Sequence, residues 1–459
     1  MITSTRQRLA LALACLTIAT LVVWYANQIA PHIRDLTRGW SQAYLFPPLN
    51  PVGADFSAGV YFPGTLLVSG KDPYVGSGLW YPPFSALFLL PYQIFDAAQA
   101  YSVHVVVLVL LTIASVWCSI NIAESAVAQG ASSPETSKPW TTIPLFLSLT
   151  FLTLSSYGFL FSVERGNIDV YPIVLCLAGL WVLIRYPKRL WLQVILFSAG
   201  AHLKVYPAVL FPLLVWKHGR RSLLPIVVVN AVLLFSLGPG PALHFVETLS
   251  GVAAYPGVWV GNHSAASFSQ MLNGFLGERW GLAIPGVDLV ILPLAIWSTS
   301  ALMLFRRGYS ASGATWLFAL SVPLMNLIPS ISHDYKLVLL GAPFAILLTI
   351  LLGEYVTSGR RAALAQIVCA CGLLILVSVS YTVVPPVLGN KYPFIFALQL
   401  LLAWVALDRP PCKPGTCTRG PGLTTRVPAS RTSQESFLGT SPPHPFAGTQ
   451  ARDNRSRHA

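Results

Sequence analysis

The sequence contains few charged residues. Only 10% of the 459 residues are Asp, Glu, Lys or Arg, against about 25% in a soluble domain. Hydrophobic residues make up 54% of the chain, and the mean hydropathy is +0.63. Long apolar runs recur from one end to the other, which excludes a soluble protein with a single anchor. The sequence therefore predicts an all-α polytopic membrane protein with about 10–12 transmembrane helices.

Cysteine is scarce outside the apolar runs, and several catalytic motifs are absent. Five of the seven cysteines lie in apolar segments, while Cys412 and Cys417 lie in the polar tail. We expect no disulfide bonds, because no cysteine falls in a segment predicted to lie outside the cell. No cluster has the spacing of metal ligands, and HExxH, Walker A, GxSxG and dinucleotide-binding motifs are missing. The sequence therefore predicts no metal and no cofactor, and it does not indicate a soluble nucleotide donor.

The positive net charge does not indicate a nucleic-acid partner. Lys and Arg outnumber Asp and Glu by 29 to 16, which gives a net charge of +13. Much of the excess lies in the tail and in short connections that follow the positive-inside rule. A soluble fold with a basic face is not indicated, so we predict membrane lipids and no nucleic acid as partners.

The basic clusters between apolar runs define the expected domain organisation. Residues 1–408 are predicted to form the transmembrane domain, with a first outer loop at 30–80 and a second long outer loop at 242–285. This arrangement puts every arginine pair between spans on the cytoplasmic side. The composition of residues 409–459 changes to Pro, Gly, Ser, Thr and Arg, so we expect a disordered cytoplasmic tail there.

One stretch in the first outer loop is unusually rich in aromatic residues, glycine and proline. It spans residues 51–91 and carries two isolated carboxylates, Asp55 and Asp72. A simple connection does not need this composition, whereas amphipathic aromatic side chains prefer the membrane interface. We therefore expect this stretch to lie at the membrane surface and to shape a site.

Ionisable side chains near membrane depth are unfavourable and therefore mark candidate functional positions. In the predicted topology such residues gather on the outer side. They are Asp55, Asp72, Glu164, Arg165, Asp169, His202, Lys204, His263, His333, Asp334 and Lys336. A carboxylate in a partly desolvated pocket can accept a proton from a hydroxyl group. Cationic groups beside it can hold a phosphate and stabilise charge on a leaving oxygen, so the combination indicates transfer from a lipid-linked phosphate.

Short motifs, in the same order along the chain, resemble those of the family 87 glycosyltransferases. They are Asp55-Phe56, Val60-Tyr61, Gly70-Lys71-Asp72-Pro73-Tyr74, Tyr81-Pro82-Pro83-Phe84, Gly166-Asn167, Leu203-Lys204-Val205-Tyr206-Pro207, Asn262-His263-Ser264 and His333-Asp334. The likeness covers roughly residues 10–405. This family has the polytopic GT-C fold and includes polyprenyl-phosphomannose-dependent mannosyltransferases and arabinofuranosyltransferases. The resemblance thus implies a GT-C-like helical bundle whose first outer loop carries the catalytic Asp.

The resemblance also implies the reaction and the residues that carry it. A sugar, mannose first and arabinofuranose next, would move with inversion from a polyprenyl phosphate to a hydroxyl of a glycolipid or glycan. The reaction would take place on the outer face of a bacterial plasma membrane. The general base would be Asp55. The expected contacts to the donor phosphate are Lys204, His333, Arg165 and Lys336. Further candidates are Asp72, Asn262, His263 and Asp334.

A transporter or flippase for a lipid-linked glycan is the alternative function. A transporter is expected to place its essential charges near the middle of the membrane, on broken helices. In this sequence only His202 and Lys204, next to the interruption between the apolar pieces 191–203 and 205–216, can lie at such a depth. Most of the charged candidates lie in outer loops and at helix ends, which favours the enzyme.

Overall fold

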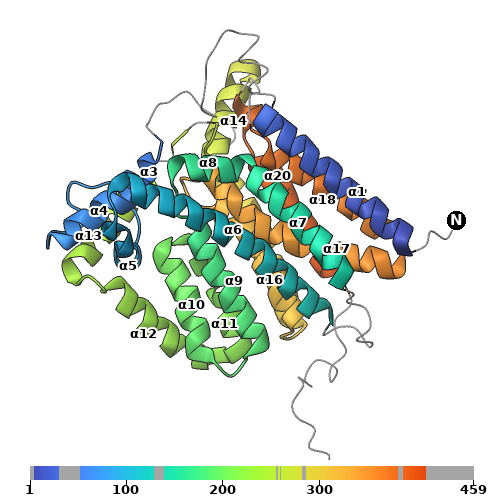
Figure 1. Ribbon diagram of the computed structural model, residues 1–459, viewed down its shortest axis with the longest axis horizontal. Coiled ribbons are helices and arrows are strands. Elements are labelled where there is room, and N and C mark those ends of the chain that lie inside the picture. The colour runs from blue at the N-terminus through green and yellow to red at the C-terminus, as the bar shows by residue number, and fades with distance from the viewer. Residues whose placement is uncertain are drawn as a thin grey trace, which may run out of the picture. The chain divides into compact units, whose positions relative to one another are not determined.

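The part of the chain that the structure describes is helical. The computed structural model describes residues 5–29, 52–128, 139–254, 257–258, 260–281, 286–380 and 386–409. These residues belong to the unit Met1–Cys417 (Figure 1). They form helices joined by turns and short connections, and their β-structure is limited to an isolated bridge between Asn262 and His333. The predicted all-α fold is confirmed, while the predicted tail lies almost entirely outside the described residues.

The helices of the first half of the chain vary widely in length. They are α1 (Thr5–Trp24), η1 (Tyr25–Ile29), α3 (Ala54–Phe56), η2 (Ser57–Tyr61), α4 (Phe62–Val68), α5 (Pro83–Phe88), η3 (Leu90–Ile94), α6 (Ala97–Ala128), α7 (Pro139–Ser155), α8 (Tyr157–Arg165), α9 (Val170–Arg185), α10 (Leu190–Leu203), η5 (Tyr206–Leu210) and α11 (Phe211–His218). The predicted helix start at Tyr81-Pro82-Pro83 is observed as α5, whose first residue is Pro83. Proline is tolerated there because the first backbone N–H groups of a helix have no partner within it.

The second half continues in the same way. Its helices are η6 (Gly219–Ser222), α12 (Leu223–Leu234), α13 (Pro239–Ala254), α14 (Ala265–Trp280), α15 (Gly286–Arg306), α16 (Ala311–Leu327), η7 (Asp334–Leu340), α17 (Gly341–Ser358), α18 (Arg361–Ser378), α19 (Pro386–Gly389) and α20 (Tyr392–Asp408).

Several of these helices can cross a membrane. Among the described residues, five are long and apolar enough, and the number rises to seven if each of two bent pairs forms one span. The five spans are Thr5–Gln28, Ala97–Val127, Leu289–Arg306, Asp334–Ser358 and Arg361–Ser378. Five shorter apolar helices accompany them. The chain is therefore a multi-pass membrane protein, and the predicted 10–12 spans would require the shorter helices to cross as well.

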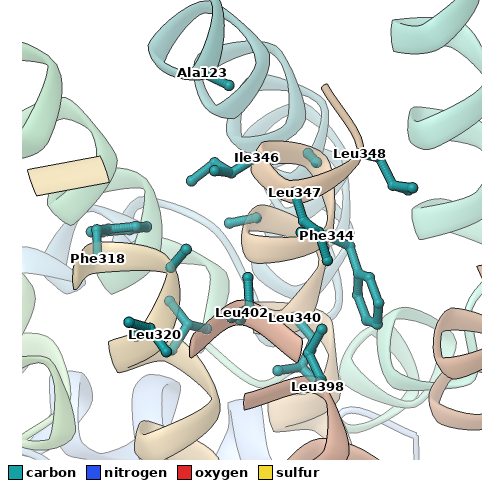
Figure 2. Close-up of a cluster of buried hydrophobic side chains, with 14 of the residues drawn as sticks. Ala123, Phe318, Leu320, Leu340, Phe344, Ile346, Leu347, Leu348, Leu398 and Leu402 are labelled. Carbon is teal, nitrogen blue, oxygen red and sulfur yellow. The ribbon is translucent and has the colours of Figure 1, made fainter. Parts of the chain in front are cut away.

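The main hydrophobic core lies where α16, α17 and α20 meet α6. Nearly every residue of α16 is buried, and 83% of the most apolar window in Asp334–Ser358 is buried. Figure 2 shows Phe318 of α16, Phe344 and Leu347 of α17, Leu402 of α20 and Ala123 of α6 gathered in this core. A helix that is covered on all sides has to be apolar on all sides. These central helices form the frame from which the segment between α16 and α17 reaches the candidate site.

The two predicted outer loops contain helices where they are described. The first carries α3, η2 and α4 between Ala54 and Val68, so Asp55 lies on a helical turn and not in an extended loop. The second contains α13, apart from its first residues, and α14. Ser264 caps the start of α14, and its hydroxyl accepts a hydrogen bond from the backbone N–H of Ser267. This cap satisfies an N–H group that would otherwise lack a partner.

Candidate active site

A cavity of about 870 Å³ lies at one end of the described helices. Its wall comes from α3 and η2, the connection before α5, α8 and the turn after it, the connection after α10, η5, α13, the end of α16, the segment that follows α16, and η7. The cavity wall includes the predicted base and all four predicted phosphate contacts. These residues are Asp55, Lys204, His333, Arg165 and Lys336. Segments far apart in the sequence thus converge on one space.

The cavity also has an extensive apolar wall. The apolar lining residues include Val205, Val209, Leu249, Leu324, Met325 and Ile328. Trp80 and Tyr81 line the same space and belong to the aromatic-rich stretch of the first outer loop. The cavity therefore combines a cluster of charges with surface that suits a hydrocarbon chain.

Asp55 and Arg165 form an ion pair at the cavity wall. Nη2 of Arg165 lies 2.5 Å from Oδ1 of Asp55, and the two side chains are 21% and 22% exposed. Nδ2 of Asn167 lies 3.5 Å from the other carboxylate oxygen, at the limit of a hydrogen bond. Arg165 is the last residue of α8, and Asp55 is the second residue of α3. The two charged side chains meet because α3 packs on the end of α8 (Figure 1).

A close backbone approach holds these two turns together. The backbone N–H of Gly53 donates to the carbonyl of Glu164 at 2.8 Å. Gly166 has a left-handed φ of 69°, and a Cβ atom added there would lie 2.5 Å from Cβ of Phe56. A larger residue at this position would strain the turn and push α3 away. The hydroxyl of Tyr101 donates to the carbonyl of Val163 at 2.6 Å and braces the same turn.

A buried histidine and two tyrosines lie behind the turn that carries Asp55. His104 is fully buried, and its Nδ1 atom lies 3.0 Å from the hydroxyl of Tyr171 and 3.3 Å from that of Tyr92. The ring centroid of Phe56 lies 4.8 Å from that of His104. Because Phe56 follows Asp55 directly, this packing fixes the backbone that positions the carboxylate.

Lys204 lies in the break between α10 and η5, where its backbone is extended. Its ammonium group lies 3.5 Å from Oδ2 of Asp169, 3.3 Å from Oδ1 of Asn167 and 4.1 Å from the ring centroid of Tyr81. Asp169 is fully buried and also accepts a hydrogen bond from the hydroxyl of Tyr206. Burial lowers the pKa of Lys204, but Asp169 and Tyr81 more than offset this effect and raise it above its ordinary value. Lys204 therefore carries its positive charge at neutral pH.

Lys336 reaches the cavity from η7. Its ammonium group donates to the carbonyl of Ile331 at 2.7 Å and lies 5.0 Å from the ring centroid of Tyr206. The close packing of η7 against α8 sets this position. Gly158 allows it, since a Cβ atom there would lie 2.6 Å from Cβ of Leu337. The basic side chains from α8 and η7 thus reach the same cavity through a direct helix contact.

His333 is a neutral group and not a further cation. Burial, followed by the positive charge of Lys336, lowers the pKa of His333 to about 3. At neutral pH its imidazole therefore offers one N–H donor and one acceptor nitrogen. His333 stays a predicted contact of the donor phosphate, and a neutral imidazole would make that contact as a hydrogen bond.

The neutral state of His333 predicts a contribution to acid sensitivity. Its pKa is about 3 in the folded protein, against an ordinary value of 6.5. As the pH falls, His333 binds a proton in the unfolded chain before it does so in the folded protein. Protonation of His333 therefore lowers the free energy of unfolding as the pH falls from about 6.5 through about 3. The slope from one such group is at most about 1.4 kcal/mol per pH unit. We expect His333→Gln to lose less thermal stability than the wild type between about pH 6.5 and pH 4. Equal losses in thermal unfolding scans of the two proteins would contradict a neutral His333.

Asn262, His263 and Asp334 lie behind the cavity wall and do not line it. Nε2 of His263 lies 2.8 Å from Oδ1 of Asp334, and both side chains are fully buried. The backbone N–H of Lys391 donates to Nδ1 of His263 at 3.1 Å, so Nε2 carries the hydrogen and donates to Asp334. Oδ1 of Asn262 accepts a hydrogen bond from the backbone N–H of Ser332 at 2.8 Å. These three predicted secondary residues therefore hold the segment that carries His333.

Two other polar candidates lie away from the cavity. Oδ1 of Asp72 accepts a hydrogen bond from the backbone N–H of Tyr74 at 2.9 Å, and Oδ2 lies 2.8 Å from Nδ1 of His244. This geometry is that of a turn stabilised by an aspartate side chain. His202 contacts Asn230, with 3.1 Å between Nε2 and Oδ1. In the described part of the chain, no group of three or more His, Cys, Asp and Glu residues could hold a metal ion.

Four residues at the charged part of the site were not assigned there from the sequence. They are Tyr81, Asn167, Asp169 and Tyr206, which contact Lys204 or Asp169 or support Lys336. Three of them belong to motifs that carried the family resemblance, and Asp169 was already among the charges predicted on the outer side. The signal was present, but the partners of these residues depend on how the helices pack.

Comparison with known proteins identifies the family to which the chain belongs. The sequence model of glycosyltransferase family 87 matches residues 79–330. This segment includes Arg165, Asn167 and Lys204, whereas Asp55 and His333 lie outside it. A search of curated proteins finds no match to the chain. Because the matched segment covers more than half of the chain, and because the expected ordered motifs and apolar helices accompany it, this multi-pass membrane protein belongs to glycosyltransferase family 87.

Proposed function

We propose that the protein transfers a sugar, with inversion, from a polyprenyl phosphate to a hydroxyl group of a glycolipid or glycan. Membership of the family makes it a membrane glycosyltransferase. One observation carries the finer proposal: a single cavity is lined by the carboxyl groups of Asp55 and Glu164, by the basic side chains of Arg165, Lys204 and Lys336, and by an apolar wall. Mannose is the first candidate sugar and arabinofuranose the second.

Asp55 is the proposed general base. Its carboxylate accepts the proton of the acceptor hydroxyl while the hydroxyl oxygen attacks the anomeric carbon of the donor. The bond from that carbon to the phosphate oxygen breaks, and its electron pair stays on the phosphate. The product is a glycoside with inverted configuration and a polyprenyl phosphate. Asp55 suits this role because it faces the cavity and is held by the packed turn around Phe56.

Arg165, Lys204 and Lys336 are the proposed cationic contacts of the donor phosphate. The phosphate gains negative charge as the sugar leaves, and nearby cations stabilise that charge in the transition state more than in the ground state. The neutral imidazole of His333 adds an N–H donor without a charge. The apolar wall at Val209, Leu324 and the residues around them offers a place for the first prenyl units.

The arrangement of the basic connections supports a cavity on the outer face of a bacterial plasma membrane. Several helices join an end near the cavity to an end that carries basic residues. For example, α9 follows Asp169 and ends at Arg185, and α17 leads from the segment of Lys336 toward Arg360. The positive-inside rule places the basic ends in the cytoplasm. The cavity ends of the same helices then face the opposite side.

A transfer assay tests the proposed function. Purified wild-type protein in lipid nanodiscs would receive radiolabelled polyprenyl-phosphate mannose or arabinofuranose, with a membrane lipid extract as acceptor. We expect one donor to be consumed and a labelled product with inverted anomeric configuration to form. A product that retains the configuration would contradict a single base. If neither donor is consumed but labelled lipid crosses the bilayer of proteoliposomes, the transporter alternative is supported instead.

A further inference from the structure

We propose that the Asp55–Arg165 ion pair is a latch that the donor phosphate opens. In this mechanism the phosphate takes Arg165 from Asp55, and the carboxylate becomes available to the acceptor hydroxyl only while the donor is bound. The inference rests on the proposed function and adds a regulation of the same site. It makes donor binding the step that activates the base.

The positions of the counter-charges single out Arg165 among the three cationic side chains of the site. The carboxylate partner of Lys204 is Asp169, which is fully buried and does not line the cavity. The ammonium group of Lys336 is held by the carbonyl of Ile331. The partner of Arg165, in contrast, is Asp55, which lines the cavity beside it. An incoming phosphate therefore competes directly with Asp55 for the guanidinium group.

The chemistry of a guanidinium group permits this exchange. Its N–H groups form a planar fork that fits the oxygens of a carboxylate and those of a phosphate equally well. A donor phosphodiester carries one negative charge, as the Asp55 carboxylate does. Both side chains of the ion pair are about one-fifth exposed, so an anion in the cavity can reach the guanidinium without unfolding any element.

The two partners differ in how firmly they are held. Asp55 has a short side chain on a turn that Gly53 ties to Glu164 and that Phe56 packs against Gly166. Arg165 has a long, rotatable stem and lies at the end of α8. When the pair opens, the guanidinium group moves and the carboxylate stays in place. Nδ2 of Asn167, 3.5 Å from Oδ2 of Asp55, remains to orient the freed carboxylate.

Opening the pair changes what Asp55 can do. While Arg165 holds Oδ1 of Asp55, that oxygen is not available to accept a hydrogen bond from an acceptor hydroxyl. Lys204, Tyr81 and Tyr335 also interact electrostatically with Asp55, but Lys204 keeps its own partner Asp169. In the absence of donor, Arg165 thus keeps the base from activating an acceptor or a water molecule.

A double-mutant cycle on ligand binding tests the latch. The probe is a farnesyl methyl phosphate diester, which carries one negative charge and no sugar, titrated by calorimetry into full-length protein in nanodiscs. We expect Asp55→Asn to lower the Kd about threefold to fivefold, because Arg165 no longer has to leave a carboxylate. We expect Arg165→Gln to raise the Kd about tenfold. In the Arg165→Gln background, Asp55→Asn should lose most of its effect.

Two further variants control the cycle. Arg165→Lys keeps the charge, so Asp55→Asn should still lower the Kd in that background, which separates loss of the latch from misfolding. Asp72→Asn removes a carboxylate outside the cavity and should leave the Kd unchanged. If Asp55→Asn lowers the Kd equally in the wild-type and Arg165→Gln backgrounds, the carboxylate of Asp55 only repels the phosphate. That result would overturn the latch. If Asp55→Asn leaves the Kd of the wild type unchanged, Arg165 does not leave Asp55 when the phosphate binds, and the latch is also overturned.

The outcome for the latch is separable from that for the proposed function. If the wild type transfers sugar but the two substitutions have additive effects on the Kd, the latch is wrong and the glycosyltransferase function stands. If the effects on the Kd are not additive but the protein transfers no sugar, an anion does open the ion pair and the proposed reaction is wrong.

Discussion

Asp55→Asn should lower the rate of sugar transfer by about 10² to 10⁴-fold, the range expected for removal of a general base. Asparagine keeps the size and shape of the side chain but accepts no proton at neutral pH. Binding of the phosphate diester should become tighter, because Arg165 then has no carboxylate to leave. The measurement is the rate of transfer from labelled polyprenyl-phosphate sugar at saturating donor and acceptor, compared with the wild type.

Asp72→Asn is the matched control for this experiment. It makes the same chemical change in the same stretch of sequence, but Asp72 pairs with His244 outside the cavity. We expect its transfer rate to remain near that of the wild type. Near-normal turnover by Asp55→Asn, with loss of turnover in Asp72→Asn, would assign the base to Asp72 instead.

Lys204→Met should have the largest effect on stability. Asp169 is fully buried, and the substitution removes the cation that balances its charge. Breaking such a buried pair lowers the free energy of unfolding by about 3 to 5 kcal/mol. The same substitution removes a proposed phosphate contact, so the KM for the donor should rise by about tenfold or more. Thermal unfolding and donor-dependent transfer rates measure the two effects.

The double variant Asp169→Asn/Lys204→Met separates the two roles of Lys204. It removes both charges, so no uncompensated carboxylate remains and most of the lost stability should return. The proposed phosphate contact is still missing, so the KM for the donor should stay high. Recovery of donor use together with stability would show that Lys204 acts only through Asp169.

The sequence by itself determined that this protein is a multi-pass membrane protein of one family. The scarcity of charge and the repeated apolar runs indicate that transfer of each segment from water to lipid is favourable. The free energy of that transfer depends on the local sequence alone. The ordered motifs led to glycosyltransferase family 87, and the membrane cost of charge directed attention to Asp55 and Lys204. These inferences did not require knowledge of which segments touch.

Only the tertiary structure decided how the charged residues are paired. Asp55 and Arg165 are separated by 110 positions, and the sequence had no means of showing that they share one ion pair. The same holds for Asp169 behind Lys204. It also holds for His333, whose neutral state depends on burial and on the nearby Lys336. Periodicity and hydropathy describe one segment at a time, whereas a cavity and its electrostatics arise from the packing of several distant segments.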